Sequence, residues 1–162
     1  MHALLSHGLA HVRCASRLVG VPPDAVAVMP SRSNHVPGAP SPLQQLCAHL
    51  VPESVPMIDL QPKPGGRSDR LVHGDAFVTG GCQDRKHVLL IDDTWVSGAT
   101  VMSAVAAIRQ AGAERVTTLV LARWLDKRYR PTSQLLTQAA QVGKWVGPQK
   151  ACPFTLDGHC PT

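Results

Sequence analysis

The chain has 162 residues, of which 44% are hydrophobic, enough for one globular domain with its own core. Only 4% of the residues are aromatic, which argues against a nucleic-acid surface that stacks bases on aromatic rings. The formal net charge of +5 suits an anionic ligand, and the basic residues are scattered rather than gathered in one run. Together these features favour a small anionic ligand over a polynucleotide.

Two further properties bear on the cellular setting. The sequence has no apolar run of the ~18–20 residues that cross a membrane, and no N-terminal signal-peptide pattern. We therefore expect a cytoplasmic protein without a membrane anchor, and a homodimer is compatible with these features. Five cysteines, an odd number, are spread over the whole chain, which favours reduced thiols over a disulfide framework.

The first third of the chain predicts helix, strand, loop and helix in turn. Residues 2–19 carry apolar side chains at near-helical spacing, which predicts one helix ending around Gly20. The apolar run 25–29 predicts a buried strand, and the proline-rich stretch 30–42 a loop. Residues 43–51 then predict a one-sided helix, for which Ser41 is a suitable N-cap.

The middle of the chain is less regular. Residues 54–60 are a second strand candidate, although Pro56 would move that strand toward a sheet edge. Residues 61–74 form a long polar, basic loop, and a loop of this length is usually functional or mobile. A small strand is expected at 76–79, before the turn at Gly80.

The clearest pattern follows. Residues 87–92 predict the strongest strand, 101–111 a helix capped by Gly112, and 116–122 another strand. Strands that alternate with helices predict an α/β fold, a three-layer parallel sheet of about four to five strands flanked by helices. We divide the chain into a domain at 1–124 and a C-terminal extension at 125–162, where periodicity decays and little regular structure is expected.

One stretch, 88–100, carries the strongest functional signal. It reads VLLIDDTWVSGAT: an apolar strand runs into Asp92 and Asp93, and a short hydroxyl-rich loop with Gly98 precedes a helix. In an open parallel sheet, ligands bind outside the carboxyl ends of the strands. Carboxylates accept hydrogen bonds from vicinal sugar hydroxyls, and the free N–H groups of a helix start bind a phosphate. A strand end and a helix cap could each occur without a ligand, but their joint spacing favours a ribose 5-phosphate site.

The segment LLIDDTWVSGAT resembles the diphosphoribosyl-binding signature of the type I phosphoribosyltransferases. It is most similar to the amidophosphoribosyltransferase-like and competence-protein-F-like branch, in which two acidic residues precede a five-residue phosphate loop and then Ala-Thr. The continuation VMSAVAAIRQAGAERVTTLVLAR matches the helix and strand that follow in that family. The resemblance covers residues 20–124 and implies transfer of a phosphoribosyl group from 5-phosphoribosyl 1-diphosphate to a nitrogen nucleophile.

The resemblance also implies roles for individual residues. Asp92 and Asp93 would hold the ribose hydroxyls as the catalytic pair, and Mg²⁺ would be carried mainly by the diphosphate substrate. The 5-phosphate would be bound by Thr94, Trp95, Val96, Ser97, Gly98, Ala99 and Thr100. The loop after the first strand, with Ser31, Arg32 and Ser33, would meet the diphosphate. In the flexible catalytic loop, Lys63, Arg67 and Arg70 would neutralise the leaving diphosphate, although a solvated basic loop explains these three equally well.

The sequence departs from the family pattern in several places, two of which bear most on function. Val96 stands where purine-salvage relatives carry an Asp that meets the base, and only about two dozen residues precede the first core strand. We therefore expect an N-terminally truncated member of the family. A non-catalytic module that binds a phosphoribosyl compound or nucleotide is the alternative. A phospho-acceptor receiver domain also places paired aspartates at a strand end, but the strand at 116–122 ends in Arg123 rather than in a further Asp.

The C-terminal extension contains Cys152, His159 and Cys160 within its last eleven residues. Zinc prefers tetrahedral sites made of Cys and His. This spacing matches no known ligand pairing and lacks a fourth ligand, which Cys14 or Cys82 could supply only through the fold. From the sequence we therefore expect no metal site. We expect the remaining histidines to be surface or structurally satisfied residues.

Overall fold

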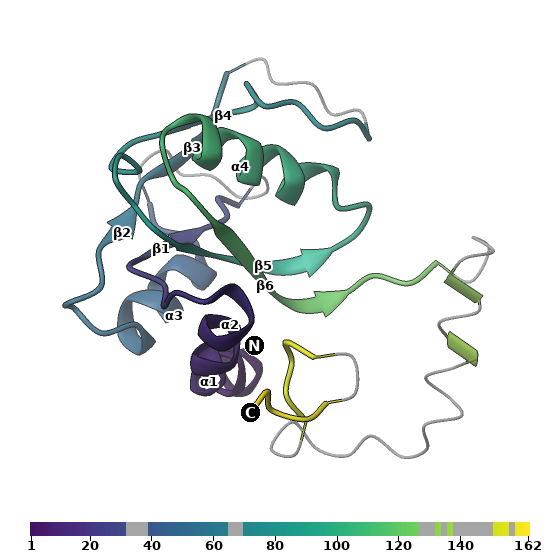
Figure 1. Ribbon diagram of the computed structural model, residues 1–162. Coiled ribbons are helices and arrows are strands. Elements are labelled where there is room, and N and C mark those ends of the chain that lie inside the picture. The colour runs from purple at the N-terminus through teal and green to yellow at the C-terminus, as the bar shows by residue number, and fades with distance from the viewer. Residues whose placement is uncertain (32–38, 65–69, 127–131, 134–135, 138–150, 156–157) are drawn as a thin grey trace.

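The computed structural model describes residues 1–31, 39–64, 70–126, 132–133, 136–137, 151–155 and 158–162 (Figure 1). Its centre is a four-stranded sheet in the order β2-β1-β5-β6, and every neighbouring pair in it is parallel. The strands are β1 (Ala25–Val28), β2 (Met57–Ile58), β5 (Val88–Trp95) and β6 (Val116–Arg123). The predicted α/β fold with a parallel sheet of about four strands flanked by helices is confirmed.

Helices cover both faces of this sheet (Figure 1). One face carries α1 (His2–Ala10), α2 (Val12–Val19) and α3 (Pro42–Leu50). The other face carries α4 (Ala99–Gln110), together with the antiparallel pair β3 (Leu60–Pro62) and β4 (Phe77–Thr79). The chain therefore forms the three layers that the sequence predicted.

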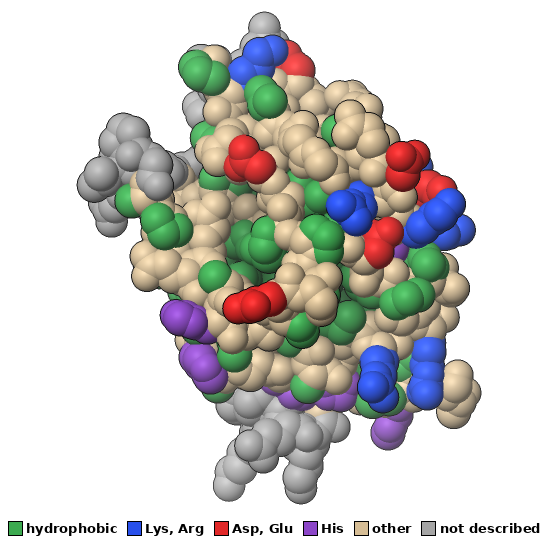
Figure 2. Space-filling view, turned by 90° about the vertical axis from the view of Figure 1, so that its left-hand side faces the viewer, with side chains coloured by type: hydrophobic (Ala, Val, Ile, Leu, Met, Phe, Trp, Pro, Cys, Tyr) green, Lys and Arg blue, Asp and Glu red, His purple; other side chains and the backbone are tan. Residues whose placement is uncertain are grey.

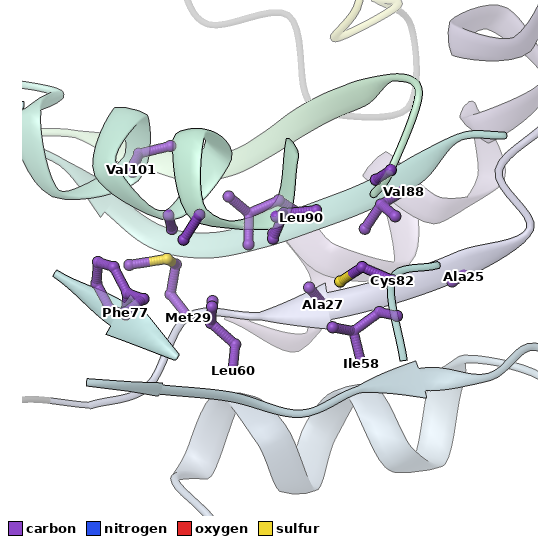
Figure 3. Packing of buried hydrophobic residues seen from close by; sticks show 14 residues of the cluster. Ala25, Ala27, Met29, Ile58, Leu60, Phe77, Cys82, Val88, Leu90 and Val101 are labelled. Atoms are coloured by element: carbon purple, nitrogen blue, oxygen red, sulfur yellow. The ribbon is translucent and has the colours of Figure 1, made fainter. Parts of the chain in front are cut away.

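The sheet has a hydrophobic core on each face, because successive side chains of its strands point to opposite faces. In β1, Ala25 and Ala27 belong to the core cluster on the α4 side, whereas Val26 and Val28 belong to the cluster on the α1 and α3 side. Successive strand side chains point to opposite faces, so a strand buried on both faces is apolar throughout. Figure 3 shows the α4-side cluster, in which Met29, just beyond β1, lies beside Phe77 of β4.

Two predicted elements are divided in the structure. The helix expected at 2–19 is broken at His11, whose φ and ψ of −98° and 9° separate α1 from α2. The strand expected at 54–60 becomes β2 and β3, which belong to different sheets. β3 turns away to pair with β4, so the long polar segment forms the connection of an antiparallel hairpin. Sequence periodicity did not predict the pairing of β3 with β4, because periodicity indicates a strand but not which other strand it pairs with.

His87 lies fully buried just before β5, and both of its ring nitrogens are bonded. Nδ1 lies 2.8 Å from the carbonyl oxygen of Val21, and Nε2 lies 2.8 Å from Thr117 Oγ1. This histidine is structurally satisfied, as expected. We predict that His87→Leu lowers the free energy of unfolding by about 2–4 kcal/mol, because it leaves a buried carbonyl and hydroxyl without a partner. Urea denaturation of His87→Leu and of the exposed control His49→Leu measures this difference.

Among the residues that the structure describes, no helix is long and apolar enough to span a bilayer. Figure 2 shows one face, on which basic and acidic side chains are interspersed. The proposed boundary between residues 124 and 125 stays a prediction. Phe154 of the C-terminal segment packs against the core cluster on the α1 and α3 side.

Candidate functional site

The site begins where β5 ends. The sequence placed a loop at 94–100, but β5 continues through Thr94 and Trp95, which pair with Ala122 and Arg123 of β6. The helix α4 already starts at Ala99, so the connection is shorter than expected. Pairing with β6 extends the strand by three residues, because a neighbouring strand continues alongside it.

Gly98 forms the turn between β5 and α4. It is the N-cap of α4, with a φ of 82° that is in the left-handed region. A Cβ atom at this position would overlap the Trp95 ring, including Cε2 at 2.8 Å. A glycine is therefore required here for two reasons, the backbone conformation and the close approach of the indole. The N–H groups of the first turn of α4, beyond Gly98, have no partner inside the helix, which is the geometry that binds anions.

A cavity of about 610 Å³ lies at this end of the sheet. The following predicted site residues line it: Asp92, Asp93, Thr94, Val96, Ser97, Gly98, Thr100 and Ser31. The acid pair, the turn and the start of α4 therefore share one space, and Ser31 joins them from the loop after β1. A cavity of this size is in the range that holds a small-molecule ligand.

The two carboxylates differ in their surroundings. Asp92 is half-buried, and Asp93 is exposed. Burial, together with the nearby charge of Asp93, raises the pKa of Asp92 to about 6, although the backbone N–H of Asp93 donates to Asp92 Oδ1 at 3.0 Å and opposes that rise. A half-buried carboxylate that costs free energy to ionise is a strong acceptor for hydroxyl donors, because a ligand hydroxyl replaces lost water.

The rest of the cavity lining was not predicted. It consists of Met1, Met29, Pro30, Ala39, Pro40, Ser41, Pro42 and Leu43, with Val101 of α4 completing the lining. Ser41 is the N-cap of α3, as expected, and forms a capping box in which Gln44 N–H donates to Ser41 Oγ at 3.2 Å. This capping motif was the only sequence signal that could have placed the amino end of α3 at the cavity.

The remaining predicted site residues lie elsewhere. Trp95 packs against Gly98 and, like Ala99, is outside the cavity lining. Lys63 and Arg70 are exposed residues of the β3–β4 connection and do not line the cavity either. Arg32, Ser33 and Arg67 lie outside the described residues. The structure therefore brings the acid pair and the turn at Gly98 together, and of the predicted basic residues the described Lys63 and Arg70 are not among the lining residues.

The charge of the cavity limits what it can bind. Among the described lining residues there are two carboxylates and neither Lys nor Arg. An anion here would be bound by backbone N–H groups and the positive end of α4, while the acidic side could accept hydroxyl groups or a divalent cation. The arrangement suits a ligand with a diol at one end and an anion at the other.

No protein-family model matches the chain, and no curated protein matches it. Among solved structures, the fold is similar to a purine phosphoribosyltransferase from Pyrococcus horikoshii Ot3, with 19% identity, a TM-score of 0.42, and coverage of 74% of this chain and 72% of that one. It is also similar to the xanthine-guanine-hypoxanthine phosphoribosyltransferase of Helicobacter pylori, with 15% identity, a TM-score of 0.40, and coverage of 82% and 93%. Likenesses of this size do not identify a ligand or distinguish a branch of the family, so the functional proposal rests on the site residues.

Proposed function

We propose that the cavity binds 5-phosphoribosyl 1-diphosphate with Mg²⁺ and that the protein transfers the phosphoribosyl group to a nitrogen nucleophile. The observation that carries the proposal is the shared lining of one cavity by Asp92, Asp93 and the turn at Gly98. Each alone is a common feature of α/β proteins. Their convergence matches the two ends of a ribose 5-phosphate, a vicinal diol and a phosphate.

The diol end is assigned to the acid pair. Asp92 extends from β5 as a half-buried acceptor, and the exposed Asp93 lies next to it on the same cavity wall. Two adjacent carboxylates can accept one hydrogen bond from each of two neighbouring hydroxyls. A hydrogen bond to a charged group contributes about 1.5–3 kcal/mol, so the pair contributes a large share of the affinity.

The phosphate end is assigned to the turn between β5 and α4. Ser97 and Thr100, which both line the cavity, add hydroxyl donors to the backbone N–H groups at the start of α4. Ser97 Oγ lies 3.4 Å from the N–H of Ala99, a long contact that an incoming phosphate oxygen can replace. A lysine is not needed for this mode of binding.

The diphosphate end requires a cation. Because the described lining is acidic, a bare diphosphate would be repelled, and Mg²⁺ carried by the substrate would offset the repulsion. Oxygen donors of the kind that Asp92 and Asp93 provide suit Mg²⁺. Phosphoribosyl transfer needs no covalent help from the protein: holding the sugar in place and stabilising the departing diphosphate are sufficient.

A second candidate is a module of the same fold that binds a phosphoribosyl compound or nucleotide without turnover. Two observations favour it. Val96 lines the cavity with 64% of its surface exposed, so an apolar side chain stands where an acceptor base would be met. Lys63 and Arg70 lie outside the cavity lining, so the described structure places no basic group against a leaving diphosphate.

Isothermal calorimetry on the full chain tests the proposal. We expect 5-phosphoribosyl 1-diphosphate with Mg²⁺ to bind, ribose 5-phosphate to bind more weakly, and inorganic diphosphate with Mg²⁺ to bind weakest because it lacks the diol. Omission of Mg²⁺ should lower the affinity for 5-phosphoribosyl 1-diphosphate more than the affinity for ribose 5-phosphate. If 5-phosphoribosyl 1-diphosphate with Mg²⁺ does not bind, the proposed transferase is wrong; if ribose 5-phosphate does not bind either, the second candidate's binding of a phosphoribosyl compound is also contradicted.

A second measurement separates the two candidates. Diphosphate release is followed with ammonia, glutamine and a panel of purine and pyrimidine bases. Release with one acceptor supports the transferase, whereas tight binding without release for any acceptor supports the non-catalytic module. Spontaneous hydrolysis of the substrate in the absence of protein sets the background rate.

A further inference from the structure

A second cluster of chemically reactive side chains lies at the two ends of the chain. His11, Cys14, Cys152 and Cys160 place one ligand atom each within 4.8 Å of one another. None of these residues lines the cavity at the end of the sheet. All three cysteines are free thiols in the structure, so the cluster is not a disulfide.

The distances match a tetrahedral metal site. His11 Nδ1 lies 3.7 Å from Cys14 Sγ and 3.5 Å from Cys160 Sγ. Zinc bonds of about 2.3 Å to sulfur and about 2.05 Å to nitrogen, at tetrahedral angles, place sulfur and nitrogen about 3.6 Å apart. One ring nitrogen therefore faces two sulfur atoms at the spacing that a shared metal ion imposes.

The local structure of the helices explains the first two ligands. His11 separates α1 from α2, and Cys14, which is 7% exposed, lies in the first turn of α2. Residues three positions apart at a helix start lie on the same face. The break at His11 therefore serves to aim its ring and the Cys14 thiol toward one point.

The other two ligands are held by a turn. The N–H of Cys152 donates to the carbonyl of Gly158 at 2.7 Å, and Thr155 Oγ1 donates to the carbonyl of His159 at 2.8 Å. Gly158, with a φ of 74°, allows the chain to reverse. Cys152, 3% exposed, and the exposed Cys160 are thereby brought to the same side of the turn.

Contacts with α1 and α2 hold this turn in place on both sides. His7 Nε2 lies 2.8 Å from the carbonyl oxygen of Ala151, and Arg17 Nη1 donates to the carbonyl of Pro161 at 2.6 Å. These contacts involve the residue before Cys152 and the residue after Cys160. Figure 1 shows the C-terminal segment, in yellow, beside α1 and α2. The site is therefore formed by the folded chain and not by one flexible tail.

We propose that these four residues form a structural zinc site of the Cys₃His type that joins the C-terminal segment to the N-terminal helix pair. Three soft thiolates and one imidazole suit Zn²⁺ better than Mg²⁺ or Ca²⁺, and four protein ligands leave no open position for a reacting water. No metal site was expected from the sequence, in which His159 was the candidate histidine and Cys14 or Cys82 a fourth ligand; in the structure the cluster contains His11 in place of His159, and Cys14.

Metal analysis of the full chain tests the proposal. The protein is purified under reducing conditions without chelator, and we expect about one zinc ion per chain. The main variant is Cys160→Ser, because Cys160 is exposed and its loss disturbs the core least. The chelator concentration that removes half of the zinc should fall by more than the ~10–100-fold that loss of an outer-shell partner costs. His11→Asn should behave in the same way.

Matched controls separate ligation from general damage. Cys47→Ala removes a buried thiol outside the cluster, and His49→Asn removes an exposed histidine of α3; both should keep the zinc. Asp92→Asn/Asp93→Asn should also keep it, so failure of the zinc site and failure of the proposed function are distinguishable. Replacement of zinc by cobalt in the unmodified protein should give the visible spectrum of a tetrahedral thiolate site, a readout that needs no variant.

Several outcomes would overturn the zinc site. They are a reduced protein that takes up no zinc, zinc whose retention is unchanged in Cys160→Ser and His11→Asn, a cobalt spectrum of octahedral type, and a bound iron–sulfur cluster. A disulfide between Cys152 and Cys160 that, once reduced, does not take up zinc would also contradict it. Retention of one zinc by the unmodified chain and the controls, with loss in both variants, would establish it.

Discussion

Gly98→Ala should lower the free energy of unfolding by about 2–4 kcal/mol and weaken binding of 5-phosphoribosyl 1-diphosphate at least tenfold. About 1–2 kcal/mol of the loss comes from a non-glycine residue in the left-handed region. The remainder comes from displacement of the Trp95 ring, which occupies the space of the new Cβ. Binding weakens because the start of α4 and its N–H groups must move.

Gly20→Ala is the matched control. Gly20 has a similar φ of 85°, but a Cβ there meets nothing within 4 Å. The difference between the two variants in urea denaturation therefore isolates the clash with Trp95 from backbone strain. Adding Trp95→Val to Gly98→Ala should restore part of the lost stability. Equal losses for Gly98→Ala and Gly20→Ala would show that the indole does not restrict this turn.

The second large effect is expected at the acid pair. Asp92→Asn/Asp93→Asn should abolish measurable binding of 5-phosphoribosyl 1-diphosphate, because each lost charged hydrogen bond costs about 1.5–3 kcal/mol, or roughly 10–150-fold. Calorimetry with Mg²⁺ present measures it. Asp75→Asn, at an exposed carboxylate outside the cavity lining, is the control and should bind normally. Unchanged affinity in the double variant would show that Asp92 and Asp93 do not bind the ribose hydroxyls.

Replacement of Asp92 alone should weaken binding but increase the stability of the fold at neutral pH. Burial raises the pKa of Asp92 to about 6 from an ordinary value of 3.8, so between these pH values the folded protein binds more protons than the unfolded chain. Stability therefore falls as the pH rises from about 4 to 6, and above that the ionised carboxylate imposes a constant cost. After a discount for partial exposure to solvent, this cost is on the order of 1–2 kcal/mol.

Asp92→Asn should accordingly be more stable than the unmodified protein at pH 7 and equal to it at pH 4. Urea denaturation at these two pH values measures the difference, and Asp75→Asn provides the comparison. A gain in stability together with a loss of binding is the expected signature of a residue kept for its ligand. If the stability gain is the same at both pH values, ionisation of Asp92 is not its cause.

The sequence by itself determined the α/β class and the main features of the candidate site. Apolar runs such as those of β1 and β5 have the pattern of strands buried on both faces, and α4 has helical periodicity. Asp92, Asp93 and Gly98 are close in sequence, so the strand end and helix start that they form were visible without the fold. Local patterns of this kind depend on neighbouring residues alone.

Only the tertiary structure decided which distant segments meet. The break at His11 has no sequence signature, and its partner Cys160 is 149 residues away. The wall formed by Met29 and the start of α3 is likewise set by the order of the strands, as is the pairing of β3 with β4. Contacts at large sequence separation depend on how the layers pack, and no periodicity along the chain encodes them.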